Sequence, residues 1–245
     1  MINKYALFVV VFILAVPGVA QAQETWTGPY VGVYADGSSS ETGYEDYGCW
    51  TACTKPTVQG TNATVGGTAG FDIQTGDGLV LGLVGDVGTG GKSSFTAHSS
   101  GLPSPTTTTW RSDIDYRATV RARIGITSGK ALVYVTGGIA MAHGVISAEA
   151  RNFPTYSTAR SSNYDATWRG TMTGAVYGAG IEYAMGPLSF KSEFLLSKFA
   201  PVSSCFANSD GPNAGVCWPT LYAIPALMRN SYAATGVRLG LNYRF

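Results

Sequence analysis

The sequence predicts an all-β protein, an eight-stranded antiparallel up-and-down transmembrane β-barrel with short periplasmic turns and four long extracellular loops. Three observations predict it. Apolar and polar residues alternate with a period of two through most of the chain, and helical periodicity is nearly absent. Short and long connections between these stretches alternate along the chain. Charged residues make up 13% of the chain, about half their usual share in globular proteins. The 32 glycines are nearly twice the usual share of glycine.

Residues 1–22 are predicted to be a cleaved signal peptide that takes no part in the fold. Lys4 supplies a positive charge, an apolar run covers Tyr5–Val16, and Ala20–Ala22 is a small-residue cleavage pattern. The alternative is a membrane-spanning helix, but the apolar run is shorter than the roughly 20 residues that such a helix needs. We therefore expect an exported chain in which residues 23–245 form one domain.

Eight strands are expected from the alternation. Their ranges are 26–36, 61–74, 78–91, 110–127, 130–148, 167–185, 187–199 and 231–245. Successive side chains of a strand point to opposite faces, so each strand has one apolar and one polar face. In the fourth strand the apolar face holds Ile114, Tyr116, Ala118, Val120, Ala122, Ile124 and Ile126, and the polar face holds Asp115, Arg117, Thr119, Arg121, Arg123 and Gly125.

The connections alternate in length along the chain. Tight turns with glycine are expected at 74–78, 127–130 and 185–187, and long loops at 37–60, 92–109, 149–166 and 200–230. Each long loop follows an odd-numbered strand, so a meander would collect all four long loops at one end. That layout is typical of transmembrane barrels. Closure follows because lipid offers no hydrogen-bond partners to an open sheet edge.

A soluble eight-stranded barrel with an apolar interior is the alternative fold. The composition of the two faces favours the membrane barrel instead. Glycines and small residues accompany full charges on the polar face, as a narrow interior requires. Tyrosines and phenylalanines lie near the strand ends of the apolar face, where membrane barrels carry an aromatic girdle.

Ten charged side chains are expected inside the barrel from strand parity: Asp72, Asp86, Asp115, Arg117, Arg121, Arg123, Glu182, Lys191, Glu193 and Arg238. Buried charges are costly unless they are paired. Five acids and five bases would neutralise one another, which predicts a salt-bridge plug that closes the lumen. The alternative is a narrow, gated ion path whose selectivity these charges set.

The four cysteines form two close pairs in predicted loops, Cys49 with Cys53 and Cys205 with Cys217. A disulfide within each pair is expected because the loops would meet an oxidising environment. Three pairings are compatible with the sequence, which does not choose among them. A zinc site is the alternative, but the two histidines are not spaced to contribute. We expect no metal and no cofactor.

No catalytic residues are predicted. His143 and Ser147 lie on one face of a strand, but ester chemistry also needs an acid that orients the histidine, and none is placed to do so. The formal net charge of +1 carries no basic excess that would indicate a nucleic-acid partner. The chain is therefore expected not to be an enzyme.

Three stretches resemble a known family: WTGPYVGVYADG (26–37), YRATVRARIGITSGKALVYVTGGIAMA (116–142) and GVRLGLNYRF (236–245). They are similar to small alphaproteobacterial outer-membrane proteins, often labelled porin-family or opacity-like. The resemblance covers the mature chain and implies an eight-stranded outer-membrane barrel with a structural or surface-antigen role. Some relatives bind haem or host ligands through their loops, for which His98 and Tyr156 are the candidates here.

The last strand is expected to pair with the first, with Tyr243 and Phe245 facing lipid at the periplasmic interface. The family resemblance implies that this terminal aromatic is an assembly signal. The expected partners are outer-membrane lipid, the barrel assembly machinery and a host or environmental ligand at the loops. The alternatives to a structural role are a small-solute porin and a loop-mediated adhesin or haem-binding receptor.

Overall fold

The structure is a computed structural model that describes residues 26–46, 55–99, 106–154, 161–209 and 227–245. Among these residues, no helix is long and apolar enough to cross a membrane. The described residues form ten strands: β1 (Gly28–Asp46), β2 (Thr57–Gln74), β3 (Leu79–Thr89), β4 (Lys92–Ser99), β5 (Thr106–Ser128), β6 (Ala131–Pro154), β7 (Ser161–Met185), β8 (Leu188–Phe199), β9 (Val202–Asn208) and β10 (Leu227–Arg244).

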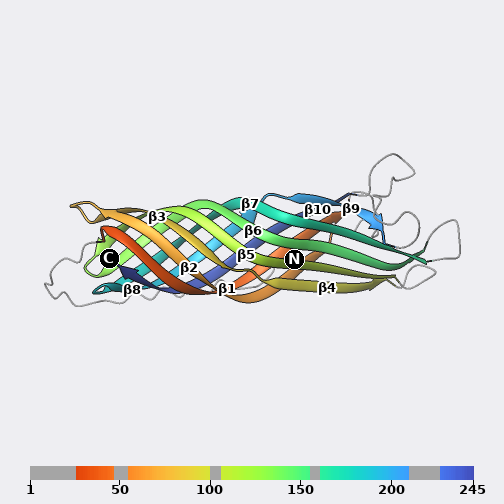
Figure 1. The fold of residues 1–245 in the computed structure, drawn as a ribbon, viewed down its shortest axis with the longest axis horizontal. Helices are drawn as coiled ribbons and strands as arrows, with labels where there is room; N and C mark the ends of the chain where they lie inside the picture. Colours follow the sequence, from red (N-terminus) through yellow and green to blue (C-terminus); the bar gives the residue numbers. More distant parts are fainter. Residues whose placement is uncertain (1–25, 47–54, 100–105, 155–160, 210–226) are drawn as a thin grey trace, which may run out of the picture.

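The strands form one antiparallel sheet that closes into a ring (Figure 1). Neighbouring strands follow the order β1-β2-β3-β5-β6-β7-β8-β10, and β10 pairs with β1, with Val33 opposite Leu241. β4 continues β3 and pairs with β5, whereas β9 continues β8 and pairs with both β7 and β10. The ring is therefore the predicted eight-stranded barrel, in which two of the eight strands are each divided in two.

Short turns join the strands at one end, which we call the turn end and which lies at the left of Figure 1. Gly78, Gly129 and Gly186 adopt φ values of +77°, +59° and +69° in these turns. Such left-handed conformations favour glycine because a Cβ would clash with the backbone. We call the opposite end the loop end. In barrels of this kind, short turns are periplasmic and longer connections are extracellular.

The strands extend much further towards the loop end than the sequence predicted. β1 continues to Asp46, β6 to Pro154, and β4 and β9 lie within predicted loops. The segments 47–54, 100–105, 155–160 and 210–226, where the remaining loop residues fall, are outside the described residues. The expected loop boundaries were therefore wrong. These strand ends are rich in serine and threonine on their outer face, a composition that also characterises loops.

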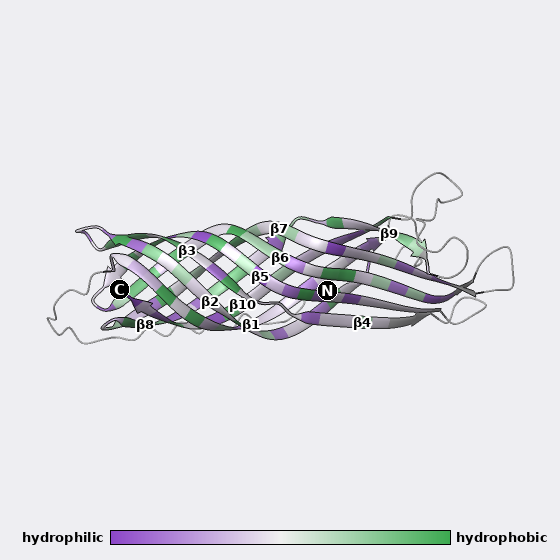
Figure 2. Ribbon diagram, viewed as in Figure 1, coloured by the Kyte–Doolittle hydropathy of each residue, from purple (hydrophilic) through white to green (hydrophobic). Residues whose placement is uncertain are grey.

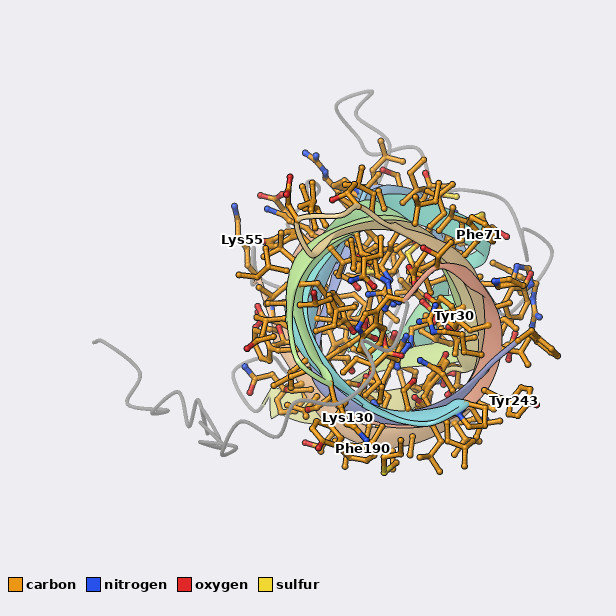
Figure 3. All side chains as sticks on the ribbon, turned by 90° about the vertical axis from the view of Figure 1, so that its left-hand side faces the viewer. Tyr30, Lys55, Phe71, Lys130, Phe190 and Tyr243 are labelled. Carbon is orange, nitrogen blue, oxygen red and sulfur yellow. The ribbon has the colours of Figure 1, made fainter. Side chains whose placement is uncertain are left out.

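An apolar band surrounds the turn-end half of the barrel, where Figure 2 shows most of the strongly apolar positions. Its outward, exposed members include Val33, Phe71, Leu83, Val120, Ile139, Tyr177, Phe190, Leu239, Tyr243 and Phe245. In the view along the barrel from the turn end, Phe71, Phe190 and Tyr243 point away from the ring and Tyr30 points into it (Figure 3). On β6 the band covers 133–141 and on β7 177–185, close to the roughly 9–11 residues that span a bilayer.

Beyond the band, the two faces of the wall exchange character. Ile146, Tyr164 and Met228 point inward and are buried, whereas the outer face of the same strands carries polar residues such as Thr167 and Ser231. β6 and β7 are 24 and 25 residues long, more than twice what a bilayer requires. The loop-end half is thus built like a soluble β-barrel.

A β-bulge in β5 separates the two halves and shifts the strand's parity. The pairing of β5 with β6 changes register between Ile114 and Tyr116, so that Asp115 is the additional residue. Ile114 points inward, and both Asp115 and Tyr116 are exposed. A bulge inserts one residue into one strand of a pair. The predictions that Asp115 lies inside and that Ile114 lies on the lipid face were therefore wrong.

Candidate functional site

The barrel interior holds the only charged groups that the structure brings together from distant strands, among the described residues, so it is the candidate functional site. Its contents change along the axis in three layers: an apolar layer at the turn end, a charged layer made of two clusters, and a second apolar layer in the loop-end half. The turn end is closed by a small apolar cluster, Trp26, Val80, Leu132, Tyr134 and Ala184. The backbone carbonyl of Trp26 accepts a hydrogen bond from Arg244 Nη1 at 2.6 Å. Arg244 of β10 therefore holds the segment that leads into β1.

Above this apolar cluster lie four charged residues, which we call the turn-side cluster: Asp72, Glu182, Arg123 and Arg244. Arg123 donates to Asp72 and, through Nη1, to Glu182 Oε2 at 2.8 Å. Arg244 Nη2 donates to Asp72 Oδ2 at 2.8 Å and lies 3.9 Å from Glu182 Oε1. Two acids and two bases thus form a closed ring of ion pairs, which is neutral on its own.

The next set towards the loop end is the loop-side cluster: Asp36, Asp86, Arg117, Arg121, Lys191, Glu193 and Arg238. Arg121 is fully buried and donates to Asp86 Oδ2 at 2.7 Å and to Glu193 Oε1 at 3.2 Å. Lys191 Nζ lies 3.6 Å from Glu193 Oε2. Removing one partner of a buried ion pair leaves the charge of the other uncompensated. Each ion pair of this cluster therefore helps to fix the packing.

Glycines on the inner face make room for inward tyrosines. A Cβ at Gly70 would lie 2.3 Å from the Tyr30 ring, and a Cβ at Gly66 or Gly88 would lie 2.4 or 2.3 Å from Tyr34. The Tyr34 ring in turn covers the guanidinium of Arg238, 3.7 Å from its centroid, a favourable cation–π geometry. The interior of an eight-stranded barrel is just wide enough for side chains to fill it, and small residues therefore alternate with large ones.

The third layer, in the loop-end half, is apolar. Its larger side chains are Tyr44, Trp110, Ile114, Ile146, Tyr164, Met172, Phe199, Phe206, Met228 and Tyr232. Tyr44 packs against Trp110 with ring centroids 6.4 Å apart and donates its hydroxyl to the Arg111 carbonyl at 2.9 Å. Among the described residues, the buried charges are therefore confined to the membrane half, whereas the loop-end interior combines this apolar layer with buried hydroxyl and amide groups such as Ser40, Thr42, Ser112 and Asn230.

Small cavities remain between the side chains of the described barrel, two of which border the charged clusters. One of about 30 Å³ lies between the loop-side cluster and the apolar layer, and one of about 20 Å³ lies beside Trp26 and Arg244. A single water molecule needs roughly 10–15 Å³ of such volume. Neither cavity is large enough for a sugar or an amino acid.

Residues 6–245 match the family model described as the outer membrane protein beta-barrel domain. The chain belongs to this family. No curated protein matches the chain. Membership places the apolar band of this outer-membrane β-barrel in the outer membrane, where lipid covers the exposed aliphatic and aromatic side chains.

Several solved outer-membrane proteins are similar to this β-barrel at low sequence identity. They include the outer membrane protease OmpT from Escherichia coli (10% identity, TM-score 0.45, covering 89% of this chain and 97% of that chain). OprG from Pseudomonas aeruginosa has 10% identity and a TM-score of 0.41, covering 89% of this chain and 97% of that chain. The attachment invasion locus protein Ail of Yersinia pestis has 10% identity and a TM-score of 0.28, covering 87% of this chain and 99% of that chain.

Nine of the ten charges predicted inside the outer-membrane β-barrel point inward in the structure. They are Asp72, Asp86, Arg117, Arg121, Arg123, Glu182, Lys191, Glu193 and Arg238. Asp115 is outside because of the bulge. Two inward charges, Asp36 and Arg244, were missed, although parity with Tyr30 and Asn242 on the same strands would have identified them.

The cysteine and loop predictions fall largely on residues that the structure does not describe. Cys49, Cys53, Cys217 and Tyr156 lie outside the described residues. Cys205 lies in β9 and is disulfide-bonded, but its partner falls outside the described part of the chain. The two proposed pairings therefore stay predictions. His98 lies in β4, with its backbone opposite Thr107.

His143 and Ser147 lie on the outer face of β6. The His143 ring stacks on Tyr116 with centroids 5.3 Å apart, and its Nδ1 lies 2.9 Å from Thr171 Oγ1. In the backbone register, Ser147 lies opposite Arg111 in β5 and Thr167 in β7. Among the residues that the structure describes, no three metal-binding side chains gather at one place.

Proposed function

We propose that this outer-membrane β-barrel has a structural and surface-antigen role. In this proposal the barrel anchors itself in lipid, keeps its lumen closed and presents its loop segments for interaction outside the cell. The observation that carries the proposal is that ion pairs cross the lumen between opposite walls. Arg121 in β5 binds Glu193 in β8, and Arg238 in β10 lies 3.2 Å from Asp86 in β3.

The energetics of the lumen support a closed barrel rather than a small-solute porin. A permeating solute would have to separate buried charges, and breaking a buried ion pair costs about 3–5 kcal/mol. It would also have to pass the layers at Trp26 and at Trp110, which are lined mainly by apolar side chains and would remove water from a polar solute. A water-filled channel needs a wider or emptier interior than eight strands with filled positions provide.

The length of the barrel supports the surface role. The walls continue well past the apolar band on β6 and β7, so the loop ends of these strands lie beyond the lipid-facing band. The apolar layer inside this extension gives it a packed core, as in soluble barrels. A rigid support of this kind suits loops that contact other molecules, because function in such scaffolds resides in the loops.

Several finer points belong to the same proposal and rest on sequence patterns. They are export by a cleaved signal peptide at 1–22, loop disulfides, recognition by the barrel assembly machinery, and kinship with alphaproteobacterial surface antigens. We also propose that the chain has no catalytic activity, supported by the contacts of the His143 ring with Tyr116 and Thr171.

Liposome swelling tests the closed lumen against the porin alternative. Purified barrel is reconstituted into liposomes, which are then diluted into isotonic arabinose, with a general porin as the positive control. The proposal predicts the same light scattering as protein-free liposomes. Swelling at a rate that increases with the amount of folded barrel would contradict it and support the small-solute porin.

A further inference from the structure

The two charged clusters differ in their balance. The turn-side cluster has two acids and two bases and is neutral. The loop-side cluster has three acids, Asp36, Asp86 and Glu193, and four bases, Arg117, Arg121, Lys191 and Arg238. Among the described residues, the interior therefore has one positive charge more than its acids can neutralise. An uncompensated charge in a low-dielectric interior is costly.

The cavity of about 30 Å³ lies next to this excess charge. Its polar lining is formed by Asp36, Ser38, Arg117, Thr119, Ser197 and Arg238, and its opposite side by apolar residues such as Phe199. The volume suits one small ion, or an ion with a water, since a water alone needs roughly 10–15 Å³. The excess charge and the free volume thus meet at one place in the fold.

Arg238 is the second observation that indicates a ligand. Its side chain is buried and lines the cavity, yet neither its Nε nor its Nη1 has a hydrogen-bond partner among the described residues. The contacts with Asp86 and Asp36 at 3.2 and 3.8 Å are close enough for ion pairing, but they leave these N–H groups unsatisfied. A buried guanidinium normally finds acceptors for its donors.

Arg117 approaches the same cavity from β5. Its Nη2 donates to Asp36 Oδ1 at 3.3 Å, to Ser38 Oγ at 3.3 Å and to Thr64 Oγ1 at 3.2 Å. Asp36 is the single acid in the lining, and its carboxylate is shared between Arg117 and Arg238. Two cations, one acid and three hydroxyl groups leave a net positive site, which selects a monovalent anion rather than a cation.

We propose that this cavity is a structural site for one small monovalent anion of the size of chloride, held by Arg117, Arg238 and Ser38. The ion neutralises the loop-side cluster and contributes to the closed state of the barrel. The site goes beyond the proposed function and does not depend on it, because a conducting barrel could bind the same ion.

Unfolding in two salts tests the site. Barrels in phospholipid vesicles are unfolded with urea in sodium chloride and in sodium gluconate of equal ionic strength, since gluconate is too large for the cavity. Chloride at ten times its Kd should raise the folded-to-unfolded ratio of the wild type about elevenfold. Arg117→Gln and Lys191→Met each remove the excess charge and should abolish this difference. Arg151→Gln, on the outer face of β6, is the matched control and should retain it.

Diffraction from bromide-soaked crystals locates the ion without any variant. The proposal predicts an anomalous peak between Arg117 and Arg238. Equal unfolding in both salts together with no peak would overturn it, and would indicate that Lys191 is neutral instead. A chloride effect that Arg117→Gln and Lys191→Met both preserve would also overturn it, since the effect would then arise elsewhere on the protein.

Discussion

Arg121 and Glu193 form an ion pair across the lumen: Arg121 Nη1 lies 3.2 Å from Glu193 Oε1, and both side chains are buried. Arg121 is in β5 and Glu193 in β8, three strands away around the ring. The pair therefore joins opposite walls rather than neighbouring strands. Such contacts fix the relative position of the walls and support the proposal of a closed lumen.

Asp36 and Asp115 should differ sharply in their effect on stability. Asp36→Asn removes the carboxylate that Arg117 and Arg238 share, and should lower the free energy of unfolding by about 3 kcal/mol. Asp115→Asn alters an exposed residue outside the barrel and should stay within about 0.5 kcal/mol. Urea unfolding in vesicles measures both. Equal effects would show that the bulge does not turn Asp115 outward.

Gly82→Ala should destabilise the turn-side cluster. A Cβ at this position would lie 2.0 Å from Asp72 Oδ1 and 3.1 Å from Arg123 Cγ, so the ion pair would have to move, at a cost of about 1–3 kcal/mol. Gly85→Ala on the same strand is the matched control, because its Cβ would meet no atom closer than 3.9 Å. Unfolding free energies that decrease equally for the two variants would count against the crowded interior.

The apolar band predicts where an outward charge is tolerated. Leu239→Arg places a charge in the band on β10 and should cost about 2–4 kcal/mol if it lies near the bilayer midplane. Ser231→Arg lies on the same face of the same strand beyond the band, and should change stability by less than about 0.5 kcal/mol. A large cost for Ser231→Arg would place the loop-end half in lipid.

Phe245 is expected to matter for assembly more than for stability. Its side chain is 72% exposed, and its ring contacts Tyr243 at 5.2 Å between centroids. Because Phe245 is largely exposed, its deletion should leave refolding of the purified chain in detergent almost unchanged. The proposed recognition of this terminal aromatic by the assembly machinery predicts that the same deletion reduces the amount of barrel inserted into the outer membrane of cells. Leu241→Ala, which also shortens a lipid-facing side chain of β10, is the control. Normal insertion after the deletion would refute an assembly role.

The sequence predicted the membrane half well because odd and even positions of a regular strand point to opposite faces, so that position alone predicts which side chains lie inside. Arg121, Glu193 and Lys191 alternate with lipid-facing neighbours without interruption, so their inward position follows from the pattern alone. Parity failed at Asp115 because alternation does not reveal a bulge: Ile114 and Asp115 fit either face until the pairing with β6 is known.

The loop-end half was harder to predict for a different reason. Outside the membrane, a strand's outer face needs only polar residues, and the serine and threonine residues of β4 and of the first part of β5 resemble those of loops. The inner face carries small residues such as Ala148 and Ala150, whose weak apolar signal hides the alternation. The ion-pair partners across the lumen were likewise not predictable, since they depend on the closed ring.

Single-channel conductance in planar lipid bilayers tests the closed lumen most directly. Folded wild-type barrel should give no steady conductance at moderate voltage, and Arg121→Ala should remain without one because the apolar layers at Trp26 and Trp110 still close both ends. A steady open channel in the wild type, with a conductance that changes on Arg121→Ala, would contradict the closed barrel and identify an ion path lined by the loop-side cluster.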